Sequence, residues 1–233
     1  MPRGTRAQAL DLIFRSAVES GEGFRTAALG IPRFGKTYHL QEVVAEAIER
    51  QICRWALVHD VKKVEPQYEG TVRASIPDLL ARPLAANDDR IIVLHPAPET
   101  PTEARPSVES VAQAALQLGR SGNPSLLCVD ELFHALSSER QWAGPTTPLI
   151  LREGSSQRVS IAFTTQIPQQ LPTEALDLCE SVSLFHLAGR SATYAAKRFE
   201  LQPEVERALP TLARGEFFLV TLEGCDGVIY GPN

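Results

Sequence analysis

The residues Gly30 to Thr37 have the spacing G-x-x-x-x-G-K-T, a pattern that can hold a chain of phosphates. Its two glycines let the backbone turn tightly, so that successive N–H groups point at an anion, and a helix beginning at the lysine adds partial positive charge. Lys36 would reach the outer phosphates and the Thr37 hydroxyl would hold Mg²⁺. We expect nucleotide contacts from the loop and the residue after it: Gly30, Ile31, Pro32, Arg33, Phe34, Gly35, Lys36, Thr37 and Tyr38.

Two carboxylates follow the apolar run Ser125 to Val129. An acidic residue at the carboxyl end of a buried strand can hold the Mg²⁺, and the next carboxylate can polarise an attacking water. We therefore predict Asp130 as a metal ligand and Glu131 as a catalytic base. Gln166 follows the predicted strand 159–165, expected beside the Asp130 strand, and can contact the outermost phosphate or the water. A glutamine that only satisfies loop backbone remains the alternative.

The elements needed to carry these groups can be predicted from the apolar pattern. Strands alternate with helices, which predicts an α/β fold with a mostly parallel sheet sandwiched by helices and an antiparallel hairpin at the C-terminal edge. Four prolines, Pro96, Pro98, Pro101 and Pro106, predict a stiff surface loop. The expected strands are 26–29, 55–58, 90–94, 125–129, 159–165, 182–187, 216–222 and 227–230, and the expected helices lie within residues 1–20, 36–48, 108–118, 149–152 and 192–199.

The composition is that of an ordinary folded domain. The chain has 233 residues, 43% of them hydrophobic and 22% charged, which excludes a disordered chain. Its net charge of −5 argues against a protein that binds polyanions with its whole surface. We expect an amphipathic helical appendage over residues 1–25 and one main domain over 26–233. No signal peptide or transmembrane segment is expected, which predicts a cytoplasmic location.

Taken together, these segments resemble the motor domain of the FtsK and HerA superfamily of DNA-translocating ATPases, which are P-loop NTPases of the RecA-like, additional-strand, catalytic-glutamate type. The segment Val58 to Glu65 is similar to the family's Asp-Pro-Lys segment, and Thr164 to Pro168 resembles its Thr-Gln-Arg-Pro sensor. Arg33 and Phe34 stand where the family usually has small residues, and Ile167 replaces its usual arginine. These departures leave the phosphate and metal ligands intact.

The resemblance implies an ATP- and Mg²⁺-dependent ring, expected to be a hexamer, that moves double-stranded DNA. In such a ring an arginine from the neighbouring subunit stabilises the charge on the transferred phosphoryl group, and position favours Arg152, followed by Arg158 and Arg190. DNA contacts are expected from basic residues on loops that face a central pore: Lys62, Lys63, Arg73 and Arg140. Trp142, beside the last of these, is expected to pack in the core or at a subunit interface rather than to stack on bases.

In size and layout the chain is similar to the genome-packaging ATPases of tailless, membrane-containing icosahedral viruses. This similarity implies the host cytoplasm or the virion as its location, and a capsid portal or a membrane protein as a partner. Two alternatives stay open. One is a zonula-occludens-toxin-like ATPase of filamentous-phage assembly, in which an aromatic residue can follow the phosphate loop as Tyr38 does here. The other is an adaptor that binds nucleotide to assemble a ring without translocating DNA.

Overall fold

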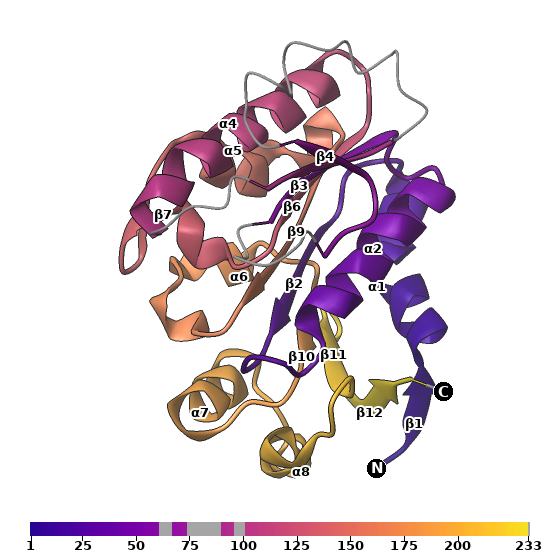
Figure 1. Cartoon of the computed structure of the whole chain (residues 1–233). Coiled ribbons are helices and arrows are strands. Elements are labelled where there is room, and N and C mark those ends of the chain that lie inside the picture. The colour runs from indigo at the N-terminus through magenta and orange to yellow at the C-terminus, as the bar shows by residue number, and fades with distance from the viewer. Residues whose placement is uncertain (61–66, 74–89, 96–100, 233) are drawn as a thin grey trace.

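A computed structural model describes residues 1–60, 67–73, 90–95 and 101–232. Within these residues ten strands form one sheet in the order β1-β12-β11-β10-β2-β9-β6-β3-β5-β4 (Figure 1). The strands of this sheet are β1 (Arg3–Thr5), β2 (Arg25–Leu29), β3 (Trp55–His59), β4 (Thr71–Arg73), β5 (Ile91–Leu94), β6 (Ser125–Val129), β9 (Val159–Thr165), β10 (Ser181–Leu184), β11 (Phe217–Thr221) and β12 (Gly224–Gly231). A separate hairpin pairs β7 (Leu136–Ser138) with β8 (Gln141–Trp142).

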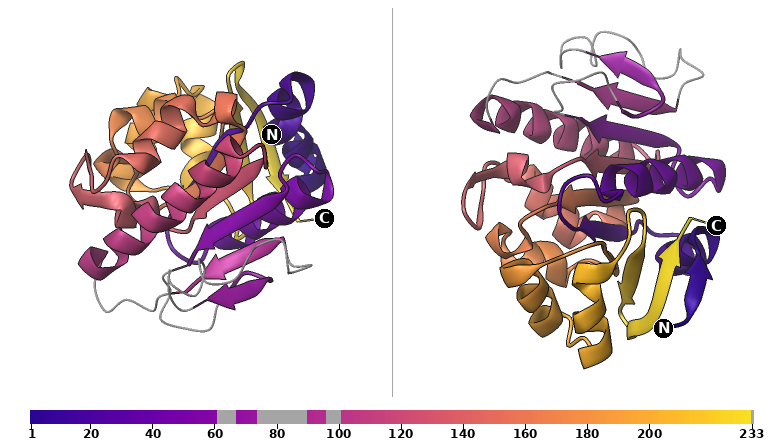
Figure 2. Two further views of the ribbon diagram at one scale, coloured as in Figure 1. Left: turned by 90° about the horizontal axis from the view of Figure 1, so that it is seen from above. Right: turned by 60° about the horizontal axis from the view of Figure 1, so that its bottom comes forward.

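The seven strands from β10 to β4 run parallel, whereas β11 is antiparallel to both of its neighbours. Helices cover both faces of this sheet, with α1 and α2 on one face and α4 and α5 on the other (Figures 1 and 2). The helices are α1 (Arg6–Ser20), α2 (Lys36–Glu49), α4 (Pro101–Arg120), α5 (Thr146–Glu153), α6 (Thr173–Asp177), α7 (Gly189–Arg198) and α8 (Pro203–Ala208). None of the helices in the described part of the chain is both long and apolar enough to cross a membrane.

The central strands are buried because both faces of the sheet are covered, and most of their residues are apolar. Every residue of β6 and of β9 is buried. Two separate core clusters result, one between the sheet and α1 and α2, the other between the sheet and the helices of the opposite face. This rigid centre brings the carboxyl ends of β2, β6 and β9 to one edge of the sheet.

The predicted α/β fold, its mostly parallel sheet and its C-terminal antiparallel hairpin are confirmed. The predicted strand over 182–187 is too long at its end: β10 stops at Leu184, and the next residues turn to bond the phosphate loop, where the N–H of Ile31 donates to the His186 carbonyl at 3.0 Å.

The loop predicted from the prolines is wrong in its second half. Pro101 and Pro106 lie in α4, and residues 96–100, with Pro96 and Pro98, lie outside the described residues. Proline fits the first turn of a helix because the N–H that it lacks would have no partner there. Pro106 lies farther in, where its carbonyl accepts the Ser110 hydroxyl at 2.9 Å.

The N-terminal segment forms the predicted helix and also one strand that sequence analysis missed. Thr5 caps α1 in a capping box with Gln8, and Gly21 ends the helix in the left-handed conformation. Strand β1 pairs in parallel with β12, and Phe14 of α1 is fully buried. These contacts join the first segment to the sheet, and the division of the chain into an appendage over 1–25 and a main domain over 26–233 stays a proposal.

Candidate active site

The phosphate loop leaves β2 at Leu29 and is held by both neighbouring strands. The N–H of Gly30 donates to the carbonyl of Thr165, the last residue of β9, at 3.2 Å, and the N–H of Ile31 donates to the His186 carbonyl after β10. A Cβ on Gly30 would lie 2.7 Å from the Phe185 Cβ, so that only glycine fits there. Gly35 has φ +101°, in the left-handed region, and directly precedes α2. The loop therefore ends at a helix N-terminus, as the motif requires.

Two large residues occupy the middle of this loop. The ring of Phe34 packs on the His186 ring with centroids 4.3 Å apart. Phe34, which stands where a small residue is usual, therefore contacts the segment after β10. The Phe34 carbonyl also accepts the N–H of Gly215 at 3.1 Å. Arg33 has φ +68° and an exposed side chain. Of the two departures from the small-residue pattern, the Phe34 side chain thus joins the loop to its surroundings.

Lys36 and Thr37 begin α2 and face the strand ends. Lys36 is buried and its Nζ donates to the Ile31 carbonyl at 2.9 Å, so the ammonium group crosses the mouth of the loop. The Thr37 hydroxyl donates to Asp130 Oδ2 at 3.1 Å. The predicted pair of metal ligands, 93 residues apart in the sequence, is therefore brought into contact.

The carboxylates after β6 are each bound by a threonine of β9. Asp130 is buried, and its Oδ1 accepts the Thr164 hydroxyl at 2.8 Å. Glu131 Oε1 accepts the Thr165 hydroxyl at 3.1 Å and the Gln166 N–H at 3.4 Å. Sequence analysis singled out Gln166 in this segment and missed the two threonines, although both precede it directly.

Burial raises the pKa of the Glu131 carboxyl, and the Thr165 hydroxyl, the Lys36 charge and the Gln166 N–H oppose that rise. A base is most effective when its pKa approaches the working pH, so a raised pKa suits Glu131 to accept a proton from water. Its backbone is unusual as well, because Glu131 has φ +74° and ψ +85°. A non-glycine residue in such a conformation stores strain, which often marks a functional position.

Lys36, Thr37, Asp130 and Glu131 line one cavity of about 650 Å³. Gln166 and Tyr38 have exposed side chains on its wall, and Tyr38 lies under the Arg6 guanidinium at 5.0 Å from its ring centroid. Three further wall residues were missed: Gln41, Gln67 and Arg214. No sequence signal marks them, because they belong to α2, to the segment after β3 and to the loop before β11.

The donor set fits both ATP phosphates and Mg²⁺. The phosphate loop offers backbone N–H groups and an ammonium group beside a helix N-terminus, which suits a polyanion. Thr37 and Asp130 offer a hydroxyl and a carboxylate in contact with each other, and oxygen ligands are those that Mg²⁺ prefers. The cavity can therefore hold a metal–nucleotide complex with Glu131 on its wall.

The three candidate arginines lie at different places. Arg152, in α5, has a half-exposed side chain that pairs with Glu174 at 2.7 Å. Arg158 lies at the amino end of β9, opposite the phosphate loop, with φ +57°. Arg190 is exposed in the first turn of α7, shortly after the segment that bonds the phosphate loop. None of the three lines the cavity.

Of the four residues predicted to contact DNA, Lys62 and Lys63 lie outside the described residues. Arg73 ends β4 at the sheet edge, and its side chain is likewise not described. Arg140 lies in the exposed turn between β7 and β8, where its Nε donates to the Gln169 carbonyl at 3.2 Å.

The nearby Trp142 packs against one core cluster and donates to Glu174 Oε1 at 2.7 Å, which confirms a packing role.

Comparison with known proteins supports the fold. No family model and no curated protein sequence matches the chain. Among solved structures, the genome packaging NTPase B204 of Sulfolobus turreted icosahedral virus 2, in complex with sulfate, has a TM-score of 0.71 at 14% identity and covers 91% of this chain and 98% of its own. Its complex with AMPPCP has a TM-score of 0.68 with the same identity and coverage. VirB4 of Thermoanaerobacter pseudethanolicus has a TM-score of 0.62 at 12% identity, covering 84% of this chain and 86% of its own.

At these identities the likeness establishes the fold. The predicted fold is therefore confirmed, because the B204 genome packaging NTPase has the same fold over 91% of this chain.

Proposed function

We propose that this chain hydrolyses ATP to ADP and phosphate and uses the energy to move double-stranded DNA, as a ring that packages a viral genome into a preformed capsid. One observation carries the ATPase proposal: Thr37, Asp130 and Glu131 meet beside Lys36 on the wall of one cavity. A likeness in fold to a genome packaging NTPase supports the DNA part.

Each residue has a definite task in this proposal. The N–H groups of the phosphate loop and Lys36 bind the phosphates, and Thr37 and Asp130 would hold the Mg²⁺, which neutralises phosphate charge when bound. Glu131 orients the attacking water and accepts its proton, and Gln166, bonded through its N–H to the same carboxylate, detects the outermost phosphate.

An arginine from a neighbouring subunit completes the site in a ring, expected to be a hexamer. Arg152, Arg158 and Arg190 all stay candidates. Arg190 gains support because it is exposed, on a segment close to the phosphate loop, whereas Arg152 would have to leave Glu174.

DNA contact is proposed for Lys62, Lys63, Arg73 and Arg140. Arg140 lies in an exposed turn. A ring presents such a turn several times, so a few cations per subunit suffice despite the net charge of −5. The host cytoplasm or the virion is the proposed place of action, and a capsid portal or a membrane protein the anchoring partner.

The decisive experiment measures steady-state ATP hydrolysis with and without long double-stranded DNA over a salt series, with Lys36→Ala as the blank. DNA should stimulate hydrolysis, and the stimulation should fade as salt rises, because phosphate contacts release counterions. Arg140→Ala should lower the salt slope of DNA binding by about 1. Arg120→Ala is the matched control, because Arg120 is an exposed arginine near the opposite edge of the sheet, bonded to Gln157.

Hydrolysis that ignores DNA at every salt concentration, in samples where rings are present, contradicts the translocase proposal. The zonula-occludens-toxin-like assembly ATPase and the adaptor would then be preferred. Glu131→Gln separates these two: an assembly ATPase should bind ATP and stall, whereas an adaptor should keep its recruiting function.

Mixed rings identify the arginine. Replacing the correct arginine by alanine should lower hydrolysis by roughly 10³-fold while nucleotide still binds. Mixing that variant with Glu131→Gln should restore part of the activity, because some sites then combine an intact glutamate with an intact neighbouring arginine. An arginine variant that mixing does not rescue acts within its own subunit or on folding.

A further inference from the structure

Two adjacent threonines at the end of β9 bind the two acidic residues after β6, one each. Thr164 Oγ1 donates to Asp130 Oδ1 at 2.8 Å, and Thr165 Oγ1 donates to Glu131 Oε1 at 3.1 Å. Both threonines are 1% exposed. Hydroxyl groups buried at this edge would destabilise the fold without partners, and the partners here are the two carboxylates of the site.

The backbone of Glu131 has an unusual conformation that a neighbouring side chain holds. Its φ of +74° lies in a region that L-residues seldom adopt. The N–H of Glu131 donates to Thr164 Oγ1 at 2.8 Å, so one threonine holds the backbone while the next holds the carboxylate. The end of β9, at Thr164 and Thr165, therefore determines where the base lies.

We propose that Thr165 is a positioning residue that aligns the Glu131 carboxylate for catalysis, and that Thr164 does the same for Asp130 as a metal ligand. This inference rests on the proposed ATPase function. It also links the sensor to the base: the Gln166 N–H and the Thr165 hydroxyl share Glu131 Oε1, so a shift of this strand end moves the base with it.

The test compares Thr165→Val with Thr165→Ser in the full chain. Valine keeps the shape and removes the hydroxyl, and serine restores it. Thr165→Val should lower kcat about 10-fold to 100-fold, because the Glu131 carboxylate loses the hydrogen bond that aligns it. ATP affinity, measured with a fluorescent ATP analogue, should stay within about twofold of the wild-type value. Thr165→Ser should recover most of kcat.

Thr26→Val is the matched control. Thr26 is a buried threonine of β2 whose hydroxyl bonds the Ser181 carbonyl at 3.3 Å, near the opposite edge of the sheet. The chemical change is the same, so kcat should stay at the wild-type value in the folded fraction. Equal loss of kcat in Thr26→Val and Thr165→Val would overturn the inference, because it would mark a general effect of a buried hydroxyl on folding.

Thr164→Val has a separate readout in nucleotide binding. Asp130 should lose its alignment as a metal ligand, so the gain in affinity for the fluorescent analogue on adding Mg²⁺ should shrink about tenfold, while affinity without Mg²⁺ stays unchanged. An unchanged Mg²⁺ effect in a folded Thr164→Val variant contradicts the role of Thr164.

A double variant decides whether Thr165 acts through Glu131. The Thr165 hydroxyl also accepts the Ile167 N–H at 3.3 Å, so a purely structural role in the loop is the rival explanation. In the Glu131→Gln background Thr165→Val should add little further loss in single-turnover hydrolysis, whereas a structural role predicts losses that multiply. Wild-type hydrolysis no higher than that of Lys36→Ala would refute the proposed function itself, while active wild type with an active Thr165→Val variant would refute only the inference.

Discussion

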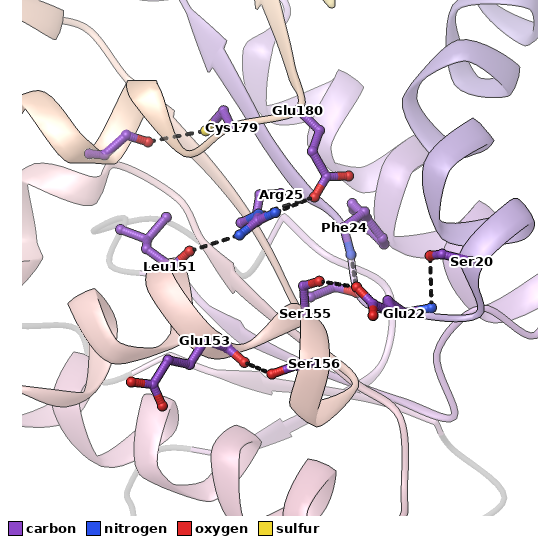
Figure 3. Close-up of polar contacts among 12 residues, drawn as sticks. Ser20, Glu22, Phe24, Arg25, Leu151, Glu153, Ser155, Ser156, Cys179 and Glu180 are labelled. Carbon is purple, nitrogen blue, oxygen red and sulfur yellow. Dashed lines mark hydrogen bonds and ion pairs between the residues drawn. The ribbon is translucent and has the colours of Figure 1, made fainter. Parts of the chain in front are cut away.

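The polar groups at the two ends of the parallel strands differ in their partners. We call the side where these strands begin the amino edge, and the side where they end the carboxyl edge. At the amino edge the polar groups bond to one another. Arg25, at the start of β2, donates to Glu180 Oε1 at 2.8 Å and to the Leu151 carbonyl at 3.2 Å (Figure 3). The Ser155 hydroxyl donates to Glu22 Oε2 at 2.8 Å in the same region. These bonds join the start of β2 to α5, to the segment after it and to the segment before β10.

At the carboxyl edge the polar groups line a cavity instead. Asp130 and Glu131 accept hydroxyl groups and still face about 650 Å³ of open volume together with Lys36. In a parallel sheet the loops that follow the strands lie together at the carboxyl edge, so ligand sites form there. The contacts at the amino edge stabilise the fold. Changes at the carboxyl edge should therefore alter turnover, and changes at the amino edge should alter the free energy of unfolding.

Glu131→Gln should have the largest effect. Removing the base should lower kcat roughly 10²-fold to 10⁴-fold, since glutamine keeps the shape but accepts no proton, while ATP binding persists. Single-turnover hydrolysis and a urea titration measure both quantities. A loss of unfolding free energy above about 1 kcal/mol would blur the distinction between the edges.

Arg25→Met should give the opposite result at the amino edge. The side chains of Arg25 and Glu180 are only 19% and 10% exposed, and losing one partner leaves a mostly buried carboxylate, at a cost of about 2–4 kcal/mol. Urea unfolding measures this loss, and kcat per folded molecule should be unchanged. Adding Glu180→Leu should restore much of the stability. Arg54→Met, at an exposed arginine, should change stability by less than about 0.5 kcal/mol.

Two buried histidines should make the fold sensitive to acid. Burial, with the charge of Arg6, lowers the pKa of His39 to about 3, and burial, with His134, lowers that of His59 to about 3, from 6.5. The unfolded chain then binds more protons than the folded one below pH 6.5, so stability falls as the pH falls from there towards about 3. Each histidine should contribute about 1.4 kcal/mol per pH unit, and urea unfolding across this range measures the slope.

Both histidines are buried and neither lines the cavity, so their protonation should act on stability and not on turnover. His39 is in the first turns of α2, bonded to the Ser183 hydroxyl at 3.0 Å, and His59 ends β3 with a bond to Ser107 at 2.7 Å. His39→Gln should therefore reduce the acid slope by one proton. The same slope in wild type and variant would mean that other groups govern the acid sensitivity.

Thr5→Ala should have the smallest effect. Loss of the N-cap of α1 should cost about 1 kcal/mol, and Thr193→Ala, within α7, serves as a control at less than about 0.5 kcal/mol. Circular dichroism and fluorescence should report one shared unfolding transition if α1 belongs to the sheet's cooperative unit. Two separated transitions would support residues 1–25 as an appendage.

Local patterns were readable from the sequence. The predicted limits of β6 and β9, residues 125–129 and 159–165, agree with the structure. The residues from Leu126 to Val129 are all apolar, because a strand covered on both faces needs no polar alternation. The phosphate loop is a contiguous motif whose glycines and lysine act on the backbone beside them. Pro101 was misread because proline favours both loops and first helical turns, and only the packing of α4 against the sheet chose between these.

The amino-acid sequence by itself determined the phosphate loop, the two acidic residues and the fold class, since each depends on neighbours along the chain. Only the tertiary structure decided which side chains from distant parts of the chain come into contact. Thr165 reaches Glu131 over 34 positions, and Arg214 reaches the cavity wall from the loop before β11. Such contacts depend on strand order and register, which no local spacing encodes.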